Sequence, residues 1–218
     1  MATTTIENYV KEIFFAEQEN PGNPVPMGTI AKALKVVPGT ATTMVKSMER
    51  NKLLKYKPRI GVTLSGKGRT LAIRMIRRHR LIEVFLVNVL KLDWDEIHED
   101  AEELEHVVSD RILEKIDELC GYPEFDPHGD PIPSADGTFK PVKHKNLMEC
   151  PTGRQLAIQR VLDQEASFLK FAMNNGLTPG ANIQVVERNP IAEAITILLD
   201  KGRQLSLGAK VAEKILVA

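Results

Sequence analysis

The stretch MGTIAKALKVVPGTATTMVKSMERNKLLKYKPRIGVTL, residues 27–64, decides the fold of the first part of the chain. Apolar residues at helical spacing predict a short helix over residues 27–34 and a second one over about 40–51, with Pro38-Gly39 at the turn between them. The apolar runs within residues 53–64, separated by a Pro and a Gly, predict a hairpin. Two helices joined by a tight turn and followed by a basic hairpin are typical of a winged helix-turn-helix.

Three further helices are predicted around this unit. Apolar spacing predicts an amphipathic helix over about residues 4–18 and a long helix over about 67–90. Asp93, with Glu96 three residues later, resembles a capping box and predicts the start of a second long helix that runs to about Leu119. The two long helices would form the core of a second domain.

The last part of the chain has a different composition and a different apolar pattern. Residues 121–146 are rich in Pro, Gly and Asp, which predicts a loop or linker. Beyond it, a helix is predicted over 166–174, among short strands that suggest a small closed sheet or barrel. The predicted strands are residues 155–161, 182–187, 194–199, 204–207 and 214–217. The predicted fold class is therefore mainly α with a small β part, divided into residues 1–70, 71–120, 121–148 (linker) and 149–218 (barrel).

Composition indicates an ordinary globular protein of 218 residues, with 43% hydrophobic and 27% charged residues. No apolar run approaches the ~18 residues of a membrane span, and the N-terminus lacks a signal pattern, so a cytoplasmic location is expected. Cys120 and Cys150 are too few for a disulfide framework and lack CxxC spacing, which favours reduced packing residues.

The net charge of zero conceals a strong asymmetry along the chain. Residues 1–80 carry 15 Lys and Arg against 5 Glu and no Asp, whereas residues 81–149 carry 6 basic against 18 acidic residues. A basic block of this size is an electrostatic footprint for a polyanion such as DNA. The acidic block beside it favours cation binding.

Three of the five histidines lie in two adjoining helical stretches, each spaced to share a helix face with carboxylates. Taken alone, such a face is more often solvated or salt-bridged surface. Here two matched faces directly follow a DNA-binding unit, and imidazole and carboxylate groups together suit a borderline divalent cation. The predicted ligands are His79 and Glu83 in the first stretch and His98, Glu102, Glu105 and His106 in the second.

The second helix of the winged unit would present small polar side chains and a lysine to the DNA major groove, with an arginine at the tip of the wing. Thr40 could instead be the N-cap of this helix, and the wing arginine could be a solvated loop residue. The candidate DNA-binding residues are Gly39, Thr40, Thr42, Thr43, Lys46 and Arg59.

Together these motifs resemble the metal-dependent repressors of the diphtheria toxin repressor and manganese transport regulator type, and the tail from about residue 150 looks like their SH3-like (FeoA-like) domain. The resemblance covers essentially the whole chain. It implies a cytoplasmic homodimer that binds Mn2+ or Fe2+ and recognises a palindromic operator in double-stranded DNA. It also implies repression of metal-homeostasis genes, with no enzymatic activity, small-molecule substrate or membrane.

The resemblance also implies a first set of ligands. Glu105 and His106 match two family ligands, and Glu102 matches a position that is cysteine in the iron branch and glutamate in the manganese branch. The N-terminal helix usually adds an aspartate or methionine, where this chain has Asn8. Lys11 stands where the manganese branch has a glutamate, which argues against a paired-ion centre of the manganese-branch type.

A second ligand set is implied as well. His79, Glu83 and His98 match the second cluster of the family. Glu165 lies near the place where the third domain offers an ancillary ligand, although its neighbour Phe168 cannot coordinate.

Two rival interpretations stay open at this point. Glu103-x2-His106 could be half of a di-iron carboxylate motif of an enzyme, but the chain has no second Glu-x2-His. A winged-helix regulator with a non-metal signal would leave the His and Glu faces merely structural. His128 and His144 lie in the Pro/Gly-rich linker and are interpreted as bystanders. The dimer interface is predicted on the long helices, at Val84, Phe85, Val89, Leu92 and Trp94.

Overall fold

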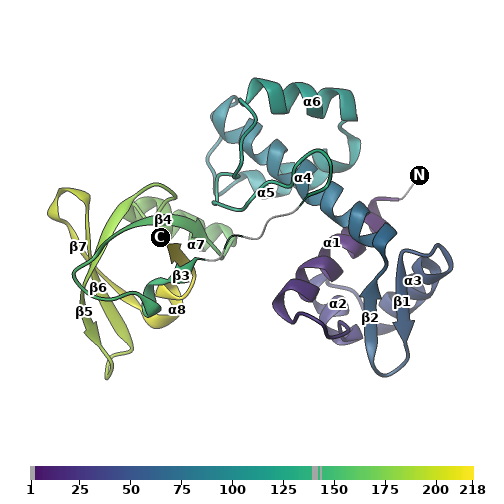
Figure 1. The fold of residues 1–218 in the computed structure, drawn as a ribbon, viewed down its shortest axis with the longest axis horizontal. Helices are drawn as coiled ribbons and strands as arrows, with labels where there is room; N and C mark the ends of the chain where they lie inside the picture. The colour runs from purple at the N-terminus through teal and green to yellow at the C-terminus, as the bar shows by residue number, and fades with distance from the viewer. Residues whose placement is uncertain (1–2, 139–141, 143) are drawn as a thin grey trace. The chain divides into compact units, whose positions relative to one another are not determined.

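The computed structural model describes residues 3–138, 142 and 144–218 (Figure 1). The chain divides into two compact units, and the division falls within the helix α4 (Gly66–Asn88), directly after His79. No helix in the described residues is long and apolar enough to cross a membrane.

The first unit contains the predicted winged helix-turn-helix, which is confirmed. Its elements are α1 (Thr4–Glu19), α2 (Met27–Ala33), α3 (Pro38–Arg50), β1 (Leu54–Lys57) and β2 (Gly61–Leu64). The two strands pair antiparallel, with Leu54 opposite Leu64, and Val25 forms a further bridge to Val62. α3 has Val37 as its N-cap, so Thr40 lies inside the first turn and is not the cap.

One apolar core holds this unit together. The buried faces of α1, α2 and α3 meet the inner side of the hairpin, and the first part of α4 adds to them. Ile13, Ile30 and Met48 are each at most 1% exposed. Burial of a side chain of this size contributes roughly 1.5–3 kcal/mol to the stability of the fold.

The predicted second long helix is wrong, because the structure has two helices in its place. α5 (Ile97–Val107) and α6 (Asp110–Leu119) are separated by an extended residue, Val108, and Ser109 caps α6 by accepting from the N–H of Ile112. The predicted capping box is wrong as well, since α5 begins at Ile97 and its N-cap makes no side-chain hydrogen bond. Leu81, Ile82 and Leu86 of α4 pack with α5 and α6 into a second core.

The C-terminal domain is a six-stranded antiparallel sheet in the order β3-β8-β4-β5-β6-β7. The five predicted strands and the predicted helix are confirmed, while β3 and the short α8 were not predicted. The elements are β3 (Lys145–Asn146), β4 (Gln155–Val161), α7 (Ala166–Asn175), β5 (Asn182–Asn189), β6 (Ala194–Leu199), β7 (Gln204–Gly208), α8 (Ala209–Ala212) and β8 (Ile215–Val217).

The residues between α6 and β3 were predicted to be a linker, and those of them that the structure describes contain little regular structure. One part of this segment is nevertheless buried, namely Asp126, His128 and Asp130. Phe125 and Pro131 form an antiparallel bridge that closes this part into a compact loop. The loop thus lies in the protein interior, where its polar groups need partners.

Candidate metal centre

Two clusters of potential ligands lie along α4 and α5. In each, the ligand atoms of three residues lie within 4.8 Å of one another: His79, Glu83 and His98 form one group, and His79, Glu102 and Glu105 form the other. His79 and Glu83 are neighbours because they are one turn apart on α4. The structure therefore brings the predicted ligands of these helices together, with His79 common to both groups.

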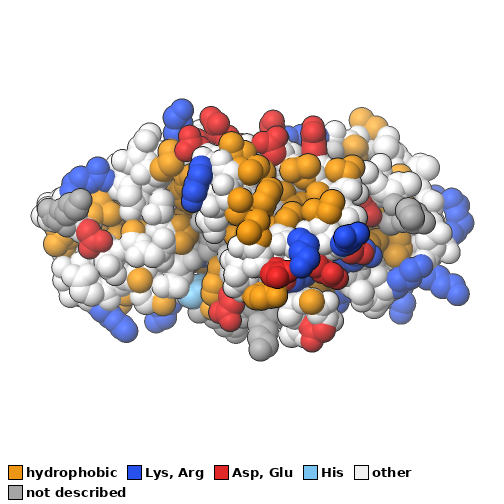
Figure 2. Space-filling model, turned by 90° about the horizontal axis from the view of Figure 1, so that it is seen from above, with side chains coloured by type: hydrophobic (Ala, Val, Ile, Leu, Met, Phe, Trp, Pro, Cys, Tyr) orange, Lys and Arg blue, Asp and Glu red, His pale blue; other side chains and the backbone are white. Residues whose placement is uncertain are grey.

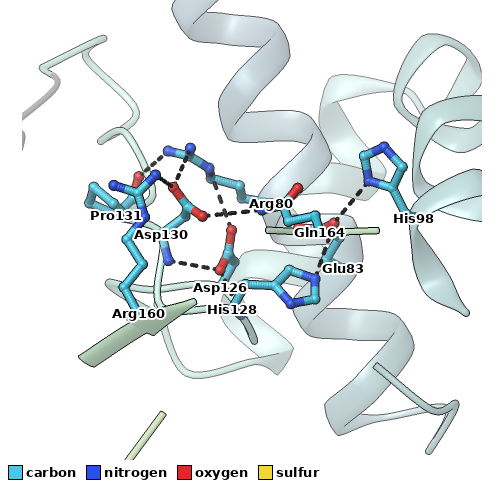
Figure 3. Close-up of polar contacts among 9 residues, drawn as sticks. All are labelled: Arg80, Glu83, His98, Asp126, His128, Asp130, Pro131, Arg160 and Gln164. Carbon is cyan, nitrogen blue, oxygen red and sulfur yellow. Dashed lines mark hydrogen bonds and ion pairs between the residues drawn. The ribbon is translucent and has the colours of Figure 1, made fainter. Parts of the chain in front are cut away.

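The first of these groups extends to a residue that the sequence analysis missed (Figure 3). The carboxylate of Glu83, 1% exposed, has its Oε1 atom 3.7 Å from Nδ1 of His98 and 3.7 Å from Nε2 of His128. His128, which was interpreted as a bystander in the linker, is fully buried against Glu83. We call His79, Glu83, His98 and His128 the Glu83 cluster.

Two buried acidic side chains, Asp126 and Asp130, lie beside the Glu83 cluster together with Arg80. Burial, and next the charges of Asp130 and Glu83, raise the pKa of the Asp126 carboxyl well above its ordinary value of 3.8, against the opposing effect of Arg80. A carboxyl group in this situation resists ionisation unless a positive charge lies near it. Buried carboxylates and imidazoles of this kind fit a divalent cation such as Mn2+ or Fe2+.

The second group, together with His106, forms what we call the Glu105 cluster: His79, Glu102, Glu105 and His106. Glu105 is fully buried, and its Oε1 atom lies 3.5 Å from Nε2 of His106. Glu103, which the di-iron interpretation requires, is exposed, whereas Glu105 is buried. The helix therefore points the carboxylate of Glu105, and not that of Glu103, into the protein.

Two residues of α1 bear on the predicted first ligand set. The Oδ1 atom of Asn8 is buried and accepts no hydrogen bond from any described residue, which leaves it available as a neutral oxygen ligand. Lys11, one turn further along the helix, is only 4% exposed. Glu165 is exposed at the N-cap of α7 and belongs to neither cluster, so its role as a ligand stays a prediction.

The candidate DNA-binding residues lie on α3 and at the wing. Thr42 and Thr43 donate their hydroxyl protons to the carbonyl oxygens of Pro38 and Gly39, one turn earlier. Arg59, at the wing tip, has a φ of +64°, which the tight turn of the hairpin requires. The exposed candidates are Gly39, Thr40, Thr43, Lys46 and Arg59, and a shallow hollow is lined by Gly39, Thr40, Thr43, Met44, Ser47 and Arg50.

Family models match three consecutive parts of the chain. Residues 1–62 match the N-terminal DNA-binding domain of iron-dependent repressors, and residues 65–134 match their metal-binding and dimerisation domain. Residues 145–218 match the FeoA domain.

Individual proteins agree with these models. The iron-dependent repressor IdeR of Mycobacterium leprae is 30% identical over 207 residues, which are 89% of this chain and 88% of that protein. A solved manganese-dependent transcriptional repressor in complex with manganese is 35% identical, covers 98% of this chain and 99% of its own, and superposes with a TM-score of 0.87. The manganese regulator SloR is 33% identical, with a TM-score of 0.77 over 98% of this chain and 97% of its own.

Proposed function

The chain belongs to the family of iron-dependent repressors, and from this membership we propose that it is a metal-dependent transcriptional repressor. In this proposal the protein acts in the cytoplasm, binds Mn2+ or Fe2+ as its signal, and represses metal-homeostasis genes. The observation that carries the proposal is the pairing of a winged helix-turn-helix with two His and carboxylate clusters on the helices that follow it. Neither part alone would distinguish a metal-dependent repressor from other winged-helix proteins.

Glu102, Glu105 and His106 of the Glu105 cluster, completed by Asn8 from α1, supply the first set of ligands in this proposal. His79 belongs to the second set, because a neutral imidazole ligates a single ion. A bound divalent cation supplies positive charge between carboxylates that otherwise repel one another. Because Asn8 belongs to the DNA-binding unit, joint ligation with Glu102 and Glu105 favours one arrangement of the two recognition helices of a dimer. Such coupling between two sites typically amounts to ~1–3 kcal/mol.

The Glu83 cluster supplies the second set. Its two imidazoles beyond the shared His79, from His98 and His128, face the same carboxylate oxygen of Glu83. We assign this cluster to a second ion. The genomic selection described below distinguishes between Mn2+ and Fe2+.

Asn8→Asp is expected to tighten Mn2+ binding by roughly tenfold, because a charged carboxylate replaces a neutral amide at a ligand position. Isothermal titration calorimetry with Mn2+ measures the change. Asn20→Asp, at the other end of the same helix, is the control and should bind as the wild type does. Unchanged or weaker binding in Asn8→Asp would remove Asn8 from the ligand set.

Lys46→Ala is expected to weaken DNA binding about equally for all sequences and to lower the salt dependence of binding by about one counterion, as loss of one phosphate contact does. Fluorescence anisotropy at several salt concentrations measures both quantities. Lys170→Ala, an exposed lysine of α7, serves as the control. A sequence-selective loss would instead assign Lys46 to a base.

The homodimer that we propose needs an apolar surface, and the middle helices provide one. Val84 and Trp94, predicted for the interface, are buried within the chain, so they do not form it. Val89 and Leu92, also predicted for the interface, are exposed and stay candidates for it. Further exposed apolar residues lie on α5, on α6 and just after them, and Figure 2 shows apolar side chains gathered on the face that is seen from above. They include Val107 (76% exposed), Ile112 (54%), Leu119 (63%) and Tyr122 (67%).

Selection of genomic fragments by the purified protein tests the whole proposal. It is carried out with Mn2+, with Fe2+ under anaerobic conditions, and with a chelator. Enrichment of a palindromic site in double-stranded DNA only with metal is the expected result, and the better ion identifies the signal. Equal enrichment in chelator would favour a winged-helix regulator with a non-metal signal.

A further inference from the structure

The loop that carries His128 has a fixed internal conformation. The Asp126 Oδ1 atom accepts hydrogen bonds from the backbone N–H groups of His128 and Asp130, both at 2.9 Å. The backbone N–H of Asp126 in turn donates to the carbonyl oxygen of Asp130 at 2.9 Å. Because these bonds close the loop on itself, the position of His128 is determined by whatever holds Asp126 and Asp130.

Two arginines from different domains hold this loop (Figure 3). Arg80 of α4 lies 2.9 Å from Asp130 Oδ1 and 3.5 Å from Asp126 Oδ2, and it donates to the carbonyl oxygen of Pro131. Arg160 of β4 contacts the same Asp130 oxygen at 2.5 Å. Breaking such a buried pair from one side is costly, since the carboxylate that remains loses its partner.

Two further contacts come from the C-terminal domain. The side-chain amide of Gln164 donates to Asp130 Oδ2 at 3.2 Å, and the backbone N–H of Val161 donates to the carbonyl oxygen of His128 at 2.9 Å. The loop is thus held on one side by the helix that carries Glu83 and on the other by the C-terminal sheet. A histidine of the Glu83 cluster is therefore placed partly by contacts from the C-terminal domain.

We propose that Arg160 is a positioning residue of the Glu83 cluster: through Asp130 it sets the place of His128, and so couples the C-terminal domain to ion binding there. This inference rests on the proposed function in that it takes the Glu83 cluster to bind a cation. The coupling is reciprocal, because an interaction that strengthens ion binding must also be strengthened by it. An ion at the Glu83 cluster then holds the C-terminal domain more firmly to α4 and α5.

The chain contains a natural reporter of this cluster. Trp94, its only tryptophan, stacks on the ring of His128 with a centroid distance of 5.2 Å and an interplanar angle of 30°. Its side chain also belongs to the apolar core of the C-terminal domain. Ligation of His128 by paramagnetic Mn2+ is therefore expected to quench the emission of Trp94.

The test compares Arg160→Gln with Arg154→Gln, an exposed arginine that lies just before β4. Mn2+ is titrated into the full-length protein while Trp94 emission is recorded, and calorimetry counts the ions and gives their separate affinities. Arg160→Gln is expected to weaken the binding event seen by Trp94 by tenfold or more, with the other event unchanged. Arg160→Lys, which keeps the charge, should restore most of the affinity, and Arg154→Gln should match the wild type.

Three results would overturn the proposal. One is a Trp94 titration in Arg160→Gln that matches the wild type. Another is a wild-type emission that does not respond while calorimetry shows Mn2+ binding, which would take His128 out of the cluster. The third is a lower melting temperature in Arg160→Gln with an unchanged Mn2+-induced rise, as a merely structural contact would give. All three are independent of whether metal stimulates DNA binding, which the genomic selection decides.

Discussion

Glu102→Ala is expected to abolish the metal dependence of DNA binding while the protein stays folded. Glu102 belongs to the Glu105 cluster, where its ligand oxygen lies within 4.8 Å of ligand atoms of His79 and Glu105. Removal of one carboxylate takes away both a ligand and a negative charge that a cation needs. The ratio of operator affinities with Mn2+ and with chelator, typically 5- to 150-fold for coupled sites, should fall to about one.

The adjacent residue provides a matched control for this experiment. Glu103 carries the same side chain on the same helix, but it is exposed and lies in neither cluster. Glu103→Ala should therefore keep the full metal dependence. Anisotropy titrations with and without Mn2+ measure the ratio, and circular dichroism checks that both variants keep their helices. A metal dependence that persists in Glu102→Ala would refute the assignment of this cluster.

Local patterns determined most of the fold, because each helix or strand that was predicted has its own periodic signal. The strands β4 and β6 begin and end at the predicted residues, since their apolar residues alternate between clear turn signals. The break between α5 and α6 was missed although the sequence contains a cue for it. Ser109 followed by Asp110 is an N-cap signal within an otherwise continuous helical pattern.

The site was harder to predict than the fold. Ligands on α4 and α5 follow from spacing within a helix, but the approach of His128 to Glu83 joins residues that are far apart in sequence. Its only local sign is the alternation of Asp126, His128 and Asp130 in a loop that folds back on itself. Whether such polar residues face solvent or an interior depends on the packing of the C-terminal domain, which no short-range pattern encodes.

The backbone of that loop leads to a second large expected effect, that of Gly129→Ala. Gly129 has a φ of +87°, and a Cβ atom there would lie 1.9 Å from the carbonyl oxygen of Gln159 on β4. Gln159 itself lies at the irregular step of the β4–β8 pairing, but the residues on either side of it are held, because Ile158 pairs with Val217 and Arg160 pairs with Leu216. The loop must therefore move off the sheet, which weakens the contacts of Arg160 and Arg80 with Asp130.

A second glycine separates this clash from simple backbone strain. Gly153 has nearly the same φ, +81°, with nothing within 4 Å of an added Cβ atom. Gly153→Ala should therefore cost only the strain of a left-handed alanine, about 1 kcal/mol. Gly129→Ala should cost roughly 3 kcal/mol or more, because it also disrupts buried ion pairs.

Urea denaturation of both variants measures the difference in their free energies of unfolding. Repeating it with Mn2+ shows whether the substitution also affects ion binding at the Glu83 cluster. If the loop positions His128, Gly129→Ala must lose the Trp94 response to Mn2+ as well as stability, since the ring of His128 moves with its backbone. Gly153→Ala must keep that response in spite of its strain. Equal losses of stability in the two variants would mean that the loop is free to leave β4, and that the C-terminal domain does not hold His128 in place.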